Sequence, residues 1–209
     1  MKLLFIKILI SCAVLCFSLN VKAQEQTERP KPPGQYPDYV IMMNGDSIPC
    51  NINISIFSGF RYSTTDSTKL IKIKPDQIKE YYVARRHMLW GSTVKEDHSS
   101  RVFLELLEKG KINLYEDYYP TTYGANKIEW FASKGSDTSK KLKSSGMLFS
   151  SSRKERKDNF SELIKDNEAV YNKYTTENKF TYDQLRNLIH WYNTGQQLPP
   201  PPPDNHLDY

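Results

Sequence analysis

Residues 39–57 constrain the fold more than any other stretch, because an apolar run there meets a turn and then an alternating pattern. The turn is Asn44-Gly45-Asp46. After it, apolar residues occupy every second position: Ile48, Cys50, Ile52, Ile54 and Ile56. Successive side chains of a β-strand point to opposite faces, so this pattern predicts a β-hairpin with one buried face.

The turn also predicts a register for this hairpin. Asn-Gly pairs favour two-residue loops, because both residues tolerate a positive φ. A two-residue loop at positions 44–45 or 45–46 pairs odd-numbered residues with even-numbered ones. Tyr39 and Ile41 would then share the apolar face with Cys50, so we expect this register rather than a three-residue loop.

Residues 1–23 have the features of a signal peptide: Lys2, an apolar stretch and the small-residue site Val21-Lys22-Ala23. We therefore expect cleavage after Ala23 and export to the periplasm or the outer membrane. Two alternatives are an uncleaved membrane anchor and lipidation at Cys12, which ends a lipobox-like Leu-Ile-Ser-Cys.

Cleavage would change the charge and the cysteine count. Lys2, Lys7 and Lys22 are three of the 29 basic residues, against 24 acidic ones, so the mature chain is close to neutral. We therefore expect no nucleic-acid partner. Cys12 and Cys16 also leave, which makes an intramolecular disulfide impossible and leaves Cys50 alone.

The rest of the chain divides by composition. Residues 24–38 and 134–156 read as linkers, rich in Pro and in Ser and Lys respectively, and residues 196–209 as a polyproline tail. Residues 39–133 form the predicted β domain, with polar loops at 93–100 and 116–126. The expected strands after the hairpin are 60–65, 69–74, 81–83, 88–90, 101–107, 112–115 and 128–132.

Residues 157–195 are predicted to be helical. Capping boxes begin at Asn159 and Thr181, apolar residues follow at helical spacing, and Gly195 fits a helix end. We therefore expect an α+β fold, in which an antiparallel β-barrel or sandwich precedes a small two- or three-helix C-terminal unit.

Four segments together resemble uncharacterised secreted proteins of Bacteroidetes-type bacteria. These segments are 39–48 with its Asn-Gly-Asp turn, 73–78, 110–115 and 188–193, which ends in Tyr-Asn. The resemblance covers roughly residues 39–193 and rests on turn and core motifs. It implies an envelope location and a β-rich body before a helical C-terminus, and it supplies no catalytic residues.

Candidate catalytic groups are few. Cys50 with His87 or His98 would be a nucleophile and its base, but the alternating pattern places Cys50 on the apolar face. Glu96, Asp97 and the two histidines match no metal-ligand spacing, so we expect neither a metal nor a cofactor.

Aromatic residues are the more plausible recognition groups. Together they would form a platform for a partner, because exposed aromatic rings suit recognition. The competing interpretation is that the rings fill the ends of the core. The possible partner-binding residues are Trp90, Tyr115, Tyr118, Tyr119, Tyr123 and Trp130.

Two further stretches have a structural and a functional interpretation. The basic run 153–157 would touch anionic lipid or serve as a solvated surface, and Pro199–Pro203 would dock in an aromatic groove or form a disordered tail.

The sequence favours an exported, non-enzymatic binding or accessory module contacting protein or glycan. The alternative is a hydrolase with its site around Cys50, His87 and His98.

Overall fold

The computed structural model describes residues 37–55, 59–64, 66–120, 126–135, 137–145 and 152–199. The predicted signal peptide and most of both terminal segments lie outside these residues. The strands are β1 Asp38–Met42, β2 Ser47–Ser55, β3 Gly59–Thr64, β4 Ile71–Lys72, β5 Ile78–Val83, β6 Met88–Lys95, β7 Arg101–Glu108, β8 Ile112–Tyr119, β9 Lys127–Lys134 and β10 Thr138–Ser144. The helices are a 3-10 turn Ala84–Arg86, then α2 Arg153–Ile164, α3 Glu168–Glu177 and α4 Tyr182–Thr194.

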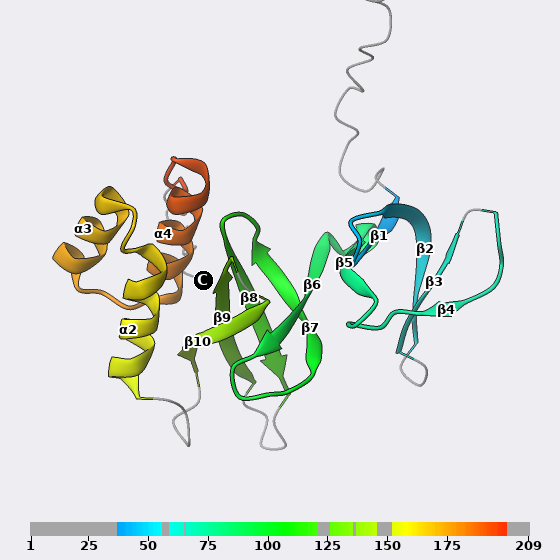
Figure 1. The fold of residues 1–209 in the computed structure, drawn as a ribbon, viewed down its shortest axis with the longest axis horizontal. Coiled ribbons are helices and arrows are strands. Elements are labelled where there is room, and N and C mark those ends of the chain that lie inside the picture. Colours follow the sequence, from blue (N-terminus) through cyan, green and yellow to red (C-terminus); the bar gives the residue numbers. More distant parts are fainter. Residues whose placement is uncertain are drawn as a thin grey trace, which may run out of the picture. The chain divides into compact units, whose positions relative to one another are not determined.

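The ten strands form one sheet, in the order β10-β9-β8-β7-β6-β5-β1-β2-β3-β4 (Figure 1). All neighbours in this order are antiparallel, and β10 also pairs in parallel with β6. This extra pairing closes β6 to β10 into a ring, while β5 and β1 to β4 continue as an open sheet. The predicted α+β class, with an antiparallel β body before a helical unit, is confirmed.

Strand β6 belongs to both parts of the sheet. Its first residues pair with β5, Trp90 to Val94 pair with β7, and Val94 and Lys95 pair with β10. Gly91, in the middle of the strand, has the Tyr115 ring beside it. A Cβ at this position would lie 2.9 Å from Tyr115 Cε1, so glycine makes room for the ring.

The register of the first hairpin differs from the predicted one. Val40 lies opposite Ile48, and residues 43–45 form a three-residue loop. A type I′ two-residue loop needs positive φ at both central residues. Here Gly45 has a φ of 94°, whereas Asn44 does not enter the positive region. One left-handed residue suits a type I turn with a bulge, so the prediction of a two-residue loop was wrong.

The change of register alters which residues face inward. Val40 is fully buried, in the position expected for Tyr39 and Ile41. Cys50 and Ile52 are buried beside it, so their predicted inward orientation is confirmed.

Three segments expected to be loops or linkers contain strand. Residues 93–95 belong to β6, residues 116–119 extend β8, and Thr138–Ser144 forms β10. These polar sequences pair because they lie in a closed ring, where hydrogen-bonded neighbours outweigh weak strand propensity. Helix α2 begins at Arg153 rather than at the predicted cap Asn159.

The other helix ends follow the predicted chemistry more closely. Thr181 Oγ1 accepts a hydrogen bond from the backbone N–H of Gln184 at 3.2 Å, which caps α4. Gly195, with a φ of 76°, ends the same helix and donates its N–H to the carbonyl of Trp191. None of the helices in the described part of the chain is long and apolar enough to cross a membrane.

The helices pack on the ring and share an apolar core with β8, β9 and β10. The side-chain amide of Asn193, in the last turn of α4, strengthens this contact. Its Oδ1 accepts from the Ile112 N–H at 2.9 Å, and its Nδ2 donates to the Ile112 carbonyl at 2.7 Å. A Cβ on Gly110 would lie 2.4 Å from Asn193 Cγ, so this glycine leaves space for the amide.

Candidate functional site

The predicted aromatic platform is not gathered in one place. Trp90 packs with the open sheet, Tyr115 lies inside the ring, and Trp130 is buried against the helices. Tyr118 is 53% exposed on β8, while Tyr119 joins a polar network described below. Tyr123 lies outside the described residues. Three of the six rings therefore fill separate cores.

The predicted catalytic residues Cys50, His87 and His98 each contact different neighbours. Cys50 is 2% exposed among apolar side chains, and burial followed by nearby Asp38 raises the pKa of its thiol to about 11. His87 ends the 3-10 turn and lies 3.5 Å from the Tyr82 hydroxyl, and His98 Nδ1 lies 2.6 Å from Asp97 Oδ1. At neutral pH Cys50 therefore carries a protonated thiol, which is a poor nucleophile.

A metal site is likewise without support in the described ranges. They contain no group of three or more His, Cys, Asp or Glu side chains that could hold a metal ion.

A pocket of about 400 Å³ lies at the junction of the open sheet and the ring. Its walls come from the first hairpin loop, from β5 to β8 and from the turns before β8 and β10. The lining residues are Met43, Lys79, Glu80, Gly91, Ser92, Arg101, Leu106, Lys109, Gly110, Asn113, Tyr115 and Asp137. We refer to this cavity as the junction pocket.

Charges of both signs line the junction pocket. The Glu80 side chain is 4% exposed, and its Oε1 lies 2.6 Å from Nζ of Lys109, which is 54% exposed. Arg101 forms an ion pair with Asp137 at another wall. Because Lys109 is largely exposed, its ammonium can return to water when a ligand donor takes its place beside the buried Glu80 carboxylate, which then keeps a hydrogen-bond partner.

Tyr115 is the aromatic wall of the junction pocket. The side chain is buried, and burial raises the pKa of its hydroxyl despite hydrogen bonds with Ser133 and Asn113. The ring therefore presents a neutral phenol and an apolar face beside the charged groups. Tyr115 was among the predicted partner-binding residues, whereas Glu80 and Arg101 were not.

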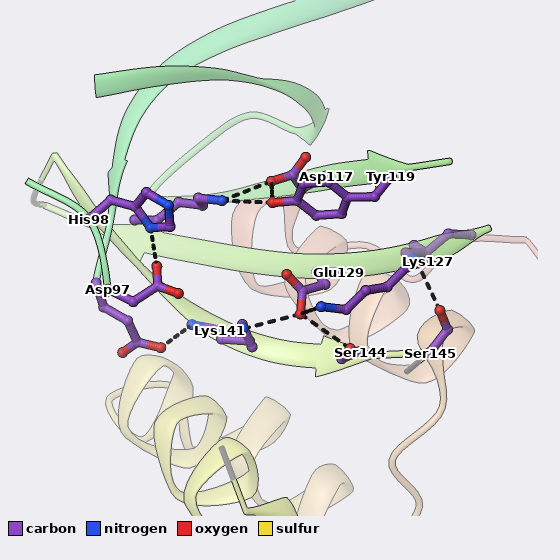
Figure 2. Close-up of polar contacts among 12 residues, drawn as sticks. Asp97, His98, Asp117, Tyr119, Lys127, Glu129, Lys141, Ser144 and Ser145 are labelled. Atoms are coloured by element: carbon purple, nitrogen blue, oxygen red, sulfur yellow. Dashed lines mark hydrogen bonds and ion pairs between the residues drawn. The ribbon is translucent and has the colours of Figure 1, made fainter. Parts of the chain in front are cut away.

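A second polar cluster lies inside the ring. The Lys95 ammonium donates to Asp117 Oδ2 at 3.1 Å and to the Tyr119 hydroxyl at 2.8 Å, and the Tyr119 hydroxyl donates to Asp117 (Figure 2). Burial lowers the pKa of Lys95, but the hydrogen bonds to Tyr119 and Asp117 outweigh burial and raise it. Lys95 is therefore a buried, charged and fully partnered lysine.

Glu129 completes this cluster from β9. Its Oε1 lies 3.0 Å from the Lys127 ammonium and 3.1 Å from the Lys141 ammonium, as Figure 2 shows. Burial raises the pKa of Glu129, but the hydrogen bonds from Lys127 and Lys141 outweigh it and hold the pKa below its ordinary value. The lysine–carboxylate network is the set of these six residues: Lys95, Asp117, Tyr119, Lys127, Glu129 and Lys141.

Tyr119 was among the predicted partner-binding residues, but the lysine–carboxylate network itself was not predicted from the sequence. On β9, Lys127 and Glu129 alternate with Ile128 and Trp130, a pattern typical of a strand with one solvent face. Ring closure turns that polar face inward, where Phe131 contacts the ammonium groups of Lys95 and Lys141 at 5.4 and 5.5 Å from its centroid.

Comparisons with protein-family models, with curated proteins and with solved structures found no match for this chain.

Proposed function

We propose that this protein is an exported binding or accessory module of the cell envelope, which contacts a protein or glycan partner through the junction pocket. Export is supported by the signal-peptide features of residues 1–23. The resemblance of residues 39–193 to secreted envelope proteins points to the same location.

The observation that carries the binding role is the buried Glu80 carboxylate in the junction pocket. Its partner Lys109 is largely exposed, so a ligand hydroxyl or amine can replace it. Arg101 supplies N–H donors nearby, and Tyr115 supplies an apolar face. Concave sites with a few convergent polar groups beside an aromatic wall are typical of ligand recognition.

Affinity capture from envelope extract tests the role of the pocket. The purified protein should retain a defined partner set, and Glu80→Gln should reduce retention about tenfold because a charged hydrogen-bond acceptor is lost. Glu105→Gln is the matched control, since Glu105 is a partly buried carboxylate on β7 that does not line the pocket. Digestion of the extract with protease or with glycosidases assigns the partner to one class.

Equal capture by Glu80→Gln and wild type, with equal melting temperatures, would overturn the pocket as the binding site. The export proposal has its own measurement. Fractionation and intact mass should find the chain in the envelope, starting at Gln24; a full-length chain in the cytosol would contradict it.

A further inference from the structure

The end of β10 and the start of α2 concentrate positive charge. Residues 140–157 hold seven of the 29 basic residues of the chain and one of its 24 acidic residues. Arg156 and Lys157 lie three and four residues after Arg153 on α2, so each of them lies on the same side of the helix as Arg153. These three residues therefore place positive charge on one side of α2, while Lys154 and Glu155 lie on other sides of the helix.

Lys143 on β10 joins these residues in space. Its ammonium donates to the Phe180 carbonyl at 2.6 Å and lies 4.8 Å from the Tyr182 ring centroid. Burial and then the nearby charges of Arg153 and Arg156 lower the pKa of Lys143, so the two guanidinium groups lie within electrostatic reach of it.

The loop between α3 and α4 adds a further lysine. Lys157 donates to Asn178 Oδ1 at 2.9 Å and Lys143 binds the carbonyl of Phe180, so the exposed Lys179 between them lies at the same surface. The basic patch consists of Lys143, Arg153, Arg156, Lys157 and Lys179.

Four of the five cations of the basic patch lack a carboxylate partner in the part of the chain that the structure describes. Among the residues that the structure describes, no ion pair with a carboxylate is found for Lys143, Arg153, Lys157 or Lys179. Four basic residues and one acidic residue, Glu155, also occupy the first five positions of α2, where the helix dipole favours negative charge. An external anionic surface would pair with these cations and would offset their unfavourable interaction with the N-terminus of α2.

We propose that the basic patch docks on anionic phospholipid headgroups of a membrane surface. The phosphates of such a surface complement a cluster of exposed and half-exposed cations, and each basic residue near the surface strengthens binding about fivefold. The choice of a membrane over nucleic acid rests on the proposed export, which brings the chain to the envelope.

Vesicle co-sedimentation of the exported protein tests this docking. Wild type should bind vesicles of phosphatidylglycerol and phosphatidylcholine in excess of its binding to phosphatidylcholine alone, and high salt should remove the excess. The variant R153Q/K157Q/K179Q should bind the anionic vesicles about 100-fold more weakly. The matched control K69Q/K72Q/K74Q removes the same charge from exposed residues near β4 and should stay within about fivefold of wild type.

Two results would overturn the proposal. One is equal vesicle binding by the two triple variants, which would show that binding depends on the net charge of the protein and not on the basic patch. The other is binding of duplex DNA, but not of anionic vesicles, that depends on the basic patch; nucleic acid would then be the partner. Circular dichroism melting of each variant checks that it is folded. Failure of Glu80→Gln to affect capture would not alter these outcomes, because the junction pocket and the basic patch share no residue.

Discussion

Lys141 and Lys143 lie two residues apart on β10, yet they belong to opposite electrostatic settings. Lys141 points into the ring and pairs with Glu129, whereas Lys143 lies over Tyr182 on the helix side without a carboxylate partner among the described residues. A β-bulge separates them. Lys141 lies opposite Phe131 and Lys143 lies opposite Trp130, so β10 has one extra residue between these two pairs. Alternation would otherwise place both on one face.

The comparison shows how one strand serves two roles. In the lysine–carboxylate network every charge has a partner, so removing Lys95 leaves the largely buried Asp117 carboxylate without its ammonium group. In the basic patch the charges are exposed or half-exposed and repel one another, so removing a member should cost the fold little. Stability measurements therefore distinguish the two regions.

The largest effect is expected for Lys95→Met. Asp117 would lose its ammonium partner while staying largely buried, and we expect the free energy of unfolding to fall by about 3 kcal/mol in urea titration. The double variant K95M/D117M should recover most of this loss, because two apolar groups replace the ion pair. A loss below about 1 kcal/mol in the single variant would contradict the buried character of the network.

A smaller and pH-dependent effect is expected for Glu129→Gln. At pH 7 the neutral amide would lose charge-assisted bonds to Lys127 and Lys141, at a cost of about 2 kcal/mol. The folded-state pKa of Glu129 is lowered, so its contribution is complete above the ordinary glutamate pKa and is lost as pH falls through the folded value.

The difference between wild type and Glu129→Gln should therefore narrow in thermal melts as the pH is lowered from 7 to 3. Glu105→Gln is the control. Burial and then Glu116 raise the pKa of Glu105, so loss of its charge should not destabilise the protein at pH 7. A constant difference between wild type and Glu129→Gln across this range would show that the carboxylate charge is not what stabilises the network.

The smallest effect on stability is expected in the basic patch. The variant R153Q/K157Q should change the free energy of unfolding by less than about 0.5 kcal/mol, with a small gain favoured because fewer cations face the helix N-terminus. A loss above about 1 kcal/mol would show that these side chains stabilise the fold.

The sequence predicted the α+β class, the first hairpin and the end of α4, because each depends on local signals. Alternation, the cap at Thr181 and the stop at Gly195 act within a few residues. The predicted hairpin register was wrong because Asn44 does not adopt the positive φ that a type I′ two-residue loop needs. Such a choice depends on the whole sheet rather than on the turn sequence.

The candidate sites depended on contacts that alternation does not encode. Glu80 and Lys109 meet from β5 and the turn before β8, and Lys95 meets Asp117 across the ring. The Lys-Lys-Leu-Lys sequence of β10 does not indicate whether Lys141 and Lys143 lie on the same face of the strand. The parallel pairing of β10 with β6 and the bulge decide this, and both follow from ring closure.

The clamp between Asn193 and Ile112 also sets an order of events during synthesis. The two residues are 81 positions apart, and the whole of the sheet is made before α4 exists. These backbone groups of Ile112 therefore lack the Asn193 amide until α4 has been synthesised, and contacts of such long sequence separation form slowly. Docking of α4 on the ring is therefore a late step of folding, which follows the formation of the strands that it covers.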